Sequence, residues 1–183
     1  MCGIAGFIGS KKIDKNYIDK TILLMRNRGP DSSAYKKKIF ENREVLLIHS
    51  RLSIIDLDSR SNQPFEDNDY TIIFNGEIYN YIELKKEIGE HFQTKSDCEP
   101  LLFLYKKHGL RFAEKIRGMY ALAIHDNFHK ELILSRDRFG IKPLYYCFTS
   151  SGFIFASEFQ AFLRAGIIRP EVRQEAYAEL LKF

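Results

Sequence analysis

The second residue of the chain is a cysteine that could act as a nucleophile. A small residue after an initiator methionine usually allows an aminopeptidase to remove Met1, which would leave Cys2 as the N-terminus. The thiol and α-amine of such a residue titrate near about 8.5 and about 7.7–8.0. The amine can therefore take the thiol proton, directly or through a water, without a histidine, and the thiolate could attack a carboxamide carbon. Taken alone, Cys2 is better explained as a small apolar residue that opens a core strand.

Asn75 and Gly76 are the second candidate for chemistry. Asn-Gly is also the strongest two-residue hairpin pattern, so a simple turn is the alternative. The residues from Glu77 to Ile88 have a helix-like pattern of Lys and Glu instead of a returning strand. We therefore predict a strand-to-helix corner that leaves the Asn75 amide and the Gly76 N–H free to point into a cleft. Two such donors suit a tetrahedral oxyanion, where the loss of one donor costs about 2.7–4 kcal/mol.

Two charged residues could recognise the charged end of a substrate. Arg51 stands amid apolar neighbours at the end of a predicted strand, where a guanidinium can clamp a carboxylate. An internal ion pair with Asp56 or Asp58 is the alternative, and it would be preferred for Arg51 alone. Asp97 stands at an apparent helix start, where its alternative role is an N-cap.

Each of these features is weak alone, but their combination is far more specific. Together they supply a thiol nucleophile, two oxyanion donors, a cation for a carboxylate and an anion for an ammonium group. A free α-amino acid with a side-chain amide satisfies all of them. Glutamine is the obvious candidate for the ligand.

The hydrophobic pattern predicts the elements that must position these residues. Short turns rich in Asp, Asn and Gly separate the later strands, which favours antiparallel pairing in an α+β layered domain. The predicted strands cover residues 2–8, 45–48, 71–74, 119–125, 131–135, 144–148 and 153–156. The predicted helices cover residues 13–26, 79–88, a segment that begins at Asp97, 158–163 and 171–182, with a loop at 28–31.

Charge and composition exclude several functions. The net charge is +4, and the densest basic clusters, Lys11–Lys12 and Lys36–Lys38, have no interleaved aromatic residues, so we assign them to a solvated loop or strand edge and expect no nucleic-acid partner. The longest apolar stretch, residues 119–124, is too short to cross a bilayer.

Cysteine usage and the N-terminus point to a reducing cytoplasm. The chain has three cysteines with no paired spacing, and no basic region with an apolar run follows Met1. We therefore expect a cytoplasmic protein with free thiols at Cys2, Cys98 and Cys147.

Six short motifs follow one another along the chain: Met1–Ile4, Arg28–Asp31, Arg51–Asp56, Asn75–Asn80, Ser96–Asp97 and Arg136–Tyr146. Together they resemble the N-terminal glutaminase domain of asparagine synthetases, among the class II (N-terminal nucleophile) glutamine amidotransferases. The resemblance runs from residue 2 to about Glu158. The residues of the third and fourth motifs favour asparagine synthetases over glucosamine-phosphate synthases and amidophosphoribosyltransferases.

The resemblance implies a four-layer αββα sandwich of two antiparallel sheets, of the N-terminal nucleophile hydrolase type. It implies that Cys2 is the nucleophile with its own amine as base, and that Asn75 and Gly76 form the oxyanion hole. Arg51 would hold the glutamine α-carboxylate, and Asp97, helped by Glu77, the α-ammonium. Backbone groups for the substrate would come from Leu52, Ser53, Ile54 and Ile55, and no metal or other cofactor is expected in this domain.

The implied reaction hydrolyses L-glutamine to L-glutamate and ammonia through a Cys2 thioester, and the ammonia passes to a synthetase domain or subunit. No Ser-Gly-Gly-x-Asp-Ser pyrophosphate loop occurs in the chain, so ATP and magnesium are expected only in a synthetase domain that is absent here. We expect residues 1–183 to be one amidotransferase type-2 domain, truncated at its C-terminal end or a natural stand-alone version. The sequence allows a homodimer but does not indicate the oligomeric state.

Three alternatives remain. The domain could bind glutamine as a regulatory module without turnover, or its ammonia could go to a surface-polysaccharide sugar instead of aspartate. A Cys/His hydrolase built on Cys98 or Cys147 with one of the histidines has no local motif to support it. His125 and His129 flank a predicted hairpin turn, with no cysteine at metal-ligand spacing.

Overall fold

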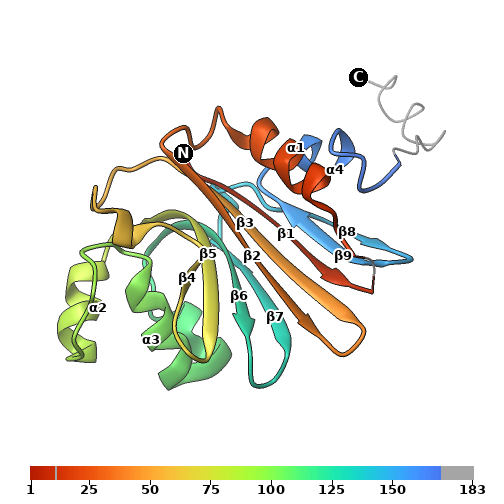
Figure 1. The fold of residues 1–183 in the computed structure, drawn as a ribbon. Helices are drawn as coiled ribbons and strands as arrows, with labels where there is room; N and C mark the ends of the chain where they lie inside the picture. The colour runs from red at the N-terminus through yellow and green to blue at the C-terminus, as the bar shows by residue number, and fades with distance from the viewer. Residues whose placement is uncertain (11, 170–183) are drawn as a thin grey trace, which may run out of the picture.

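The computed structural model describes residues 1–10 and 12–169. Two antiparallel sheets lie face to face, and helices cover the outer face of each (Figure 1). The five-stranded sheet has the order β2-β3-β1-β9-β8, and the four-stranded sheet has the order β4-β5-β6-β7. The predicted four-layer αββα sandwich is therefore confirmed. The predicted helix at residues 171–182 lies outside the described residues.

The elements have the following bounds. The five-stranded sheet contains β1 (Gly3–Gly9), β2 (Ser32–Phe40), β3 (Arg43–Arg51), β8 (Tyr145–Thr149) and β9 (Gly152–Ala156). The four-stranded sheet contains β4 (Phe65–Glu66), β5 (Tyr70–Ile78), β6 (Gly118–Asp126) and β7 (Glu131–Arg136). The helices are α1 (Lys15–Met25), α2 (Tyr81–Ile88), α3 (Glu99–His108) and α4 (Gln160–Leu163), with short 3-10 helices η1 (Ser59–Ser61) and η2 (Gly109–Glu114).

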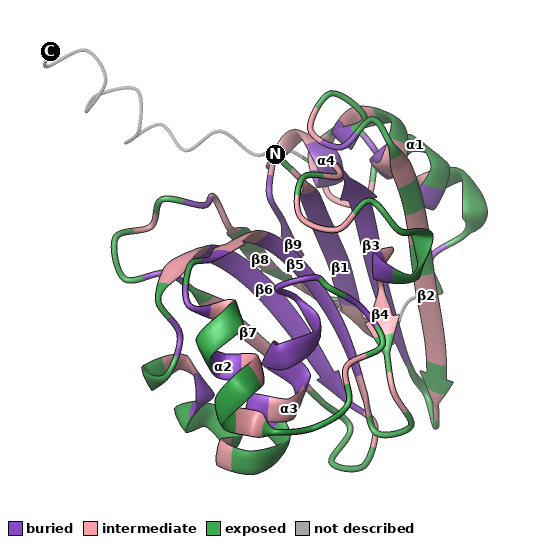
Figure 2. Ribbon diagram, turned by 90° about the vertical axis from the view of Figure 1, so that its left-hand side faces the viewer, coloured by how far each residue is buried: buried purple, intermediate pink, exposed green. Residues whose placement is uncertain are grey.

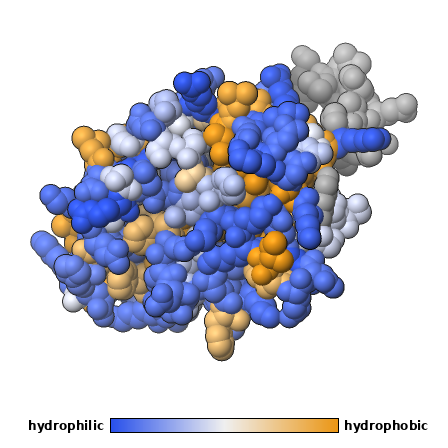
Figure 3. Space-filling model, in the orientation of Figure 1, coloured by the Kyte–Doolittle hydropathy of each residue, from blue (hydrophilic) through white to orange (hydrophobic). Residues whose placement is uncertain are grey.

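Side-chain alternation along each strand divides the apolar core into three layers. On β1, Ala5 and Phe7 pack with α1 and α4, while Ile4 packs between the two sheets with Ile73 of β5. On β5, Phe74 turns the other way and packs with residues of α2 and α3. Both sheets are therefore buried along their facing surfaces (Figure 2). The face in Figure 3 is mainly hydrophilic, with apolar side chains scattered over it.

The helix α1 illustrates how the sequence fixes an element. Asp14 accepts a hydrogen bond from the Tyr17 N–H at 3.1 Å and so caps its start. Ile18, Thr21 and Met25 are buried at helical spacing against the five-stranded sheet. The prediction of this helix from residues 13–26 is confirmed, with ends shifted by one or two residues.

The predicted corner directly after Phe74 is wrong. Strand β5 continues to Ile78, with Asn75 opposite Ala121 and Gly76 opposite Tyr120, and α2 begins only at Tyr81. The polar residues stay in the strand because β6 provides a pairing partner along their whole length. A side chain at Gly76 would place its Cβ 2.2 Å from the Met119 carbonyl oxygen, so glycine permits this close pairing.

Strand β2 was missed as an element. The sequence assigns its lysines, Lys36 to Lys38, to a solvated loop or strand edge, and β2 is one of the two edge strands of its sheet. Lysine-rich edge strands resist pairing with other chains, which explains a composition unlike that of a core strand. The predicted segment that begins at Asp97 forms α3 from Glu99. No helix among the described residues is long and apolar enough to cross a membrane.

Gly6 provides a test of how tightly β1 is enclosed in its sheet. A methyl group there would lie 2.4 Å from the Phe155 ring and 2.7 Å from the Leu46 carbonyl oxygen, whereas at Gly3 it would meet the flexible Met25 side chain at 3.1 Å. We expect Gly6→Ala to lower the free energy of unfolding by about 1–3 kcal/mol, and Gly3→Ala by much less. Urea denaturation of both variants measures this difference, and equal losses would contradict the tight packing.

Candidate active site

A cavity of about 160 Å³ opens at one end of the sandwich, where strands of both sheets end. It brings together most of the residues that the sequence predicts for the site, from segments far apart in the chain. Ser53 is not among the lining residues, and its N–H donates to the Asp31 carboxylate at 2.7 Å. The predicted residues that line the cavity are Cys2, Arg51, Leu52, Ile54, Ile55, Asn75, Gly76, Glu77 and Asp97.

Cys2 is positioned by the strand that follows it. It precedes β1 and shares the alternation of Ile4, so its side chain turns into the space between the sheets. The Leu52 N–H donates to the Cys2 sulfur at 3.4 Å, and the Arg28 Nε donates to the Cys2 carbonyl at 3.0 Å. Burial raises the pKa of the Cys2 thiol, and the Leu52 N–H, the nearby chain terminus and Arg51 oppose this only in part. The thiol therefore needs a base.

Met1 also lines the cavity. While it is present, the Cys2 nitrogen is an amide and cannot act as that base. The buried Lys142 ammonium contacts the Met1 sulfur at 3.2 Å. Lys142 was not predicted as a site residue, because only the tertiary fold brings it to the N-terminus.

Gly76 offers a backbone donor at a free strand edge. Strand β4 pairs with Thr71 and Ile72 of β5, and the rest of this edge has no neighbouring strand among the described residues. The Phe74 N–H on this edge donates to the Gln63 side chain at 2.6 Å, and the Ile78 N–H donates to the Asp97 carboxylate at 2.9 Å. The Gly76 N–H lies between them by strand alternation, without a backbone partner in the sheet.

Asn75 offers a second donor, from its side chain. Alternation with Phe74 turns this side chain into the space between the sheets, where it is 1% exposed and lines the cavity. Its Nδ2 is buried without a hydrogen-bond partner among the described residues. A buried unpaired N–H is costly, typically by about 1–3 kcal/mol, so this donor is suited to a bound acceptor. The two predicted donors therefore face the cavity from a continuous strand instead of a corner.

Arg51 ends β3 and holds the segment that follows it. Its guanidinium donates to the Asp58 carbonyl at 3.0 Å, to the Asn62 side chain at 2.7 Å and to the Asp56 carbonyl. The alternative of an ion pair with the carboxylates of Asp56 or Asp58 is not what the structure shows, since the acceptors there are backbone carbonyls. Three of the five N–H groups are used in these bonds, and the other two donate to no acceptor within the described part of the chain.

Asp97 provides the negative charge of the cavity. It is not the N-cap of α3, because Cys98 occupies that position. Burial raises the pKa of the Asp97 carboxyl to about 6, against the lowering effect of hydrogen bonds from the Ile78 and Asp97 N–H groups, and Glu77 raises it further. Asp97 forms no ion pair within the described part of the chain. It is therefore a buried carboxylate suited to a ligand cation.

The structure does not support a Cys/His hydrolase site built on Cys98 or Cys147. None of the five histidines lines the cavity, and His49 is bound to the Phe74 carbonyl oxygen at 3.1 Å, with burial lowering its pKa to about 4. Burial raises the pKa of the Cys98 thiol well above its usual value. Cys147 contacts the carbonyl of its neighbour Phe148 and does not line the cavity. No cluster of metal-binding side chains occurs in residues 1–10 and 12–169.

Comparison with known proteins decides the family. The chain matches the glutamine amidotransferase domain family over residues 1–183. The chain belongs to this family. It is 40% identical over 169 residues to asparagine synthetase (glutamine-hydrolyzing) 2 of Bacillus subtilis, covering 88% of this chain and 22% of that protein. It is 37% identical over 183 residues to the amidase chry2 of Gibberella zeae, covering 91% of this chain and 27% of that protein.

A solved structure supports the fold. The glutamine phosphoribosylpyrophosphate amidotransferase of Bacillus subtilis, complexed with ADP and GMP, superimposes with a TM-score of 0.71 at 22% identity. The match covers 90% of this glutamine amidotransferase domain and 44% of that chain. The resemblance and the fold class predicted from the sequence are thus confirmed. The domain spans only about a quarter of the length of the two sequence relatives.

The raised pKa of Asp97 predicts a pH-dependent stability cost. A carboxyl whose folded pKa lies above its unfolded value favours the fold at low pH, and that contribution is lost as the pH rises through about 6. Asn cannot ionise but can still accept the Ile78 N–H bond. We therefore expect Asp97→Asn to raise the free energy of unfolding relative to the parent by up to roughly 3 kcal/mol at pH 7.5, and much less at pH 4. Denaturant titrations at both pH values measure this, and a difference that does not change with pH would contradict the assigned pKa.

Proposed function

We propose that this glutamine amidotransferase domain hydrolyses L-glutamine to L-glutamate and ammonia through a thioester at Cys2. The observation that carries the proposal is that one cavity is lined by Cys2 and by Asn75, whose Nδ2 has no partner among the described residues, together with Arg51 and the buried Asp97. A nucleophile without donors could not stabilise a tetrahedral intermediate, and donors without charges could not select an amino acid. This cavity provides both.

The reaction follows from these positions. After removal of Met1, the Cys2 amine takes the thiol proton and the thiolate attacks the amide carbon of the glutamine side chain. The Asn75 Nδ2–H and the Gly76 N–H donate to the oxygen as it becomes negative. The C–N bond then breaks, the amine passes its proton to the leaving nitrogen, and ammonia departs. A water, deprotonated by the same amine, attacks the thioester, releases glutamate and restores the thiol.

The remaining lining residues select the substrate. The open side of the Arg51 guanidinium faces a carboxylate, and the Asp97 carboxylate, with Glu77 beside it, faces an ammonium group. The backbone of Leu52, Ile54 and Ile55 contributes to the wall of the cavity. A ligand that carries both charges on one carbon and an amide beyond them satisfies each group.

The partner of this domain follows from the relatives. We assign the ammonia to an asparagine-synthetase-like domain or subunit that amidates aspartate with ATP and magnesium, because the sequence relatives include such proteins and are about four times longer. The relative named amidase leaves another acceptor as the second candidate. We place the reaction in the cytoplasm, where its three free thiols stay reduced.

A blocked N-terminus tests the amine as base. We expect a chain with a cleavable extension joined to Cys2 to melt like the parent. It should form no thioester and release no ammonia, because its Cys2 nitrogen is an amide. Cleavage directly before Cys2 in the same preparation is the matched control and should restore activity. Full glutaminase activity in a chain shown by mass spectrometry to retain Met1 would exclude this mechanism.

Asn75→Asp tests the oxyanion donor. The substitution replaces an N–H donor with a carboxylate that repels negative charge, so we expect kcat to fall by about 10²-fold or more with little change in KM. Asn80→Asp is the matched control, because the Asn80 side chain only binds the backbone of Lys115 and Arg117. That control should change Tm more than kcat. A kcat within a few-fold of the parent for Asn75→Asp would assign this residue a structural role.

A further inference from the structure

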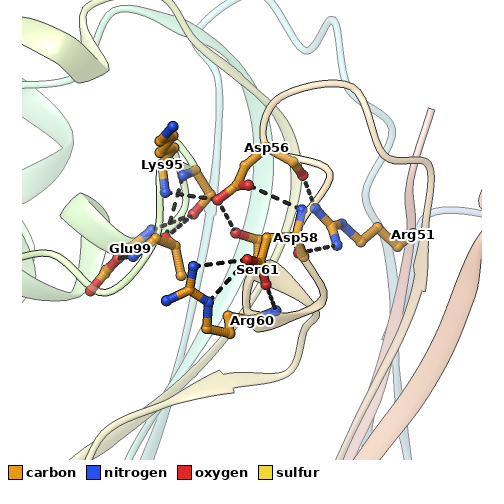
Figure 4. A network of polar contacts seen from close by, with 9 residues as sticks. Arg51, Asp56, Asp58, Arg60, Ser61, Lys95 and Glu99 are labelled. Atoms are coloured by element: carbon orange, nitrogen blue, oxygen red, sulfur yellow. Dashed lines mark hydrogen bonds and ion pairs between the residues drawn. The ribbon is translucent and has the colours of Figure 1, made fainter.

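A compact set of polar contacts surrounds Asp56, in the segment that follows Arg51 (Figure 4). One carboxylate oxygen of Asp56 accepts the Ser61 hydroxyl at 2.6 Å and the Lys95 N–H at 2.7 Å. Its other oxygen accepts the Asp58 N–H at 3.1 Å, and its carbonyl accepts an N–H of the Arg51 guanidinium. All the acceptor groups of Asp56 are therefore engaged.

These contacts join two layers of the fold. Arg51 is the last residue of β3, in the five-stranded sheet. Asp97 precedes α3 and is bound to the end of β5, in the four-stranded sheet. The bond from the Lys95 N–H to Asp56 connects the segment held by Arg51 with the turn that carries Asp97, two residues further along. A chain of hydrogen bonds therefore runs from Arg51 through Asp56 to the turn that carries Asp97.

The turn that carries Asp97 is firmly held on its other side. The Glu99 carboxylate accepts the N–H groups of Gln93 and Thr94, both at 2.8 Å, and the Thr94 hydroxyl at 2.7 Å. These bonds hold the turn together, and the Lys85 ammonium also donates to the Thr94 carbonyl at 2.8 Å, while Asp97 is bound to β5. The bond from the Lys95 N–H to Asp56 ties this turn to the segment held by Arg51.

The backbone at Asp56 is unusual for a residue with a side chain. Its φ is +58°, in the left-handed region, which costs on the order of 1 kcal/mol for such residues. Asp tolerates this region better than most residues because its short side chain can bond to the local backbone, as it does here to the Asp58 N–H. The conformation turns the carbonyl to Arg51 and the carboxylate to Lys95 at the same time.

We propose that Asp56 is a positioning residue that sets the spacing between the Arg51 guanidinium and the Asp97 carboxylate, and so makes the site selective for the charged end of an α-amino acid. The inference rests on the proposed function. A ligand with both a carboxylate and an ammonium group on one carbon requires both partners at a fixed separation. A ligand with only one of these charges can shift toward its single partner, so its affinity does not depend on the separation between Arg51 and Asp97.

The test is the affinity for three ligands in a Cys2→Ala background, which binds without turnover. The ligands are glutamine, 4-carbamoylbutanoate, which lacks the ammonium group, and 4-aminobutanamide, which lacks the carboxylate. In Asp56→Asn the amide nitrogen cannot accept a hydrogen bond, so the side chain loses either the bond from the Asp58 N–H or the bonds from Ser61 and Lys95 together. Where the amide oxygen does face Lys95, it is neutral and a weaker acceptor than the carboxylate, so the link is weakened in either arrangement. We expect calorimetry to show a loss of about tenfold or more for glutamine, equivalent to about 1.4 kcal/mol, and less than about twofold for each single-charge ligand.

Two further variants sharpen the comparison. Asp56→Gly removes the carboxylate but accommodates the positive φ, so it should show the same selective loss even if the Asn variant folds poorly. Asp58→Asn is the matched control, because the Asp58 carboxylate is exposed and bonds only to Arg60. Its affinity for all three ligands should equal that of the parent.

The other outcomes overturn the inference in distinguishable ways. Unchanged glutamine affinity in both Asp56 variants, or equal losses for all three ligands, would show that Asp56 does not set the spacing. Failure of the Cys2→Ala parent itself to bind glutamine would overturn the proposed function, and this inference with it.

Discussion

The free edge of β5 is the constraint on which the site depends. Strand β4 ends after two residue pairs, so within residues 1–10 and 12–169 no strand lies beside the N–H groups of Phe74, Gly76 and Ile78. Buried N–H groups without partners are costly, and the fold compensates two of the three with side chains, Gln63 for Phe74 and Asp97 for Ile78. The same bond that satisfies Ile78 places the carboxylate of Asp97 in the cavity. Gly76 is left with an N–H that a ligand oxygen can accept.

The charge selectivity that we propose depends on this edge. Because Asp97 is fixed to β5 and Arg51 ends β3, the two sheets each contribute one charge to the cavity. The stacking of the sheets sets the approximate separation of these charges, and the loop from Arg51 to Asn62 refines it through hydrogen bonds. Burial makes Asp97 reluctant to ionise, which is unfavourable for the empty fold but strengthens its attraction to a bound cation.

The sequence was most informative through the combination of features. Cys2 and Arg51 each had a better structural explanation when taken alone, and they became site residues only as part of a set that a free α-amino acid with a side-chain amide satisfies. The corner at Asn75 was wrong because the helix-like pattern from Glu77 onward was outweighed as far as Ile78 by pairing with β6, a tertiary effect that local patterns do not contain. Lys142 and the bridge from Asp56 to Lys95 were not predicted for a related reason: each joins segments whose proximity exists only in the folded chain.

The pairing of the first strand with one of the last described strands also bears on the order of events during synthesis. Strand β1 lies between β3 and β9, and the Ile4 N–H and carbonyl both bond to Ser157. The N-terminus therefore cannot be enclosed until more than 150 residues have left the ribosome. At about 5–20 residues per second, this delay is on the order of ten seconds. Before the sheet closes, Met1 and Cys2 lack the contacts that hold them in the fold, the Lys142 contact with the Met1 sulfur and the Arg28 bond to the Cys2 carbonyl, so the removal of Met1 that we propose meets no restraint from the fold during this period.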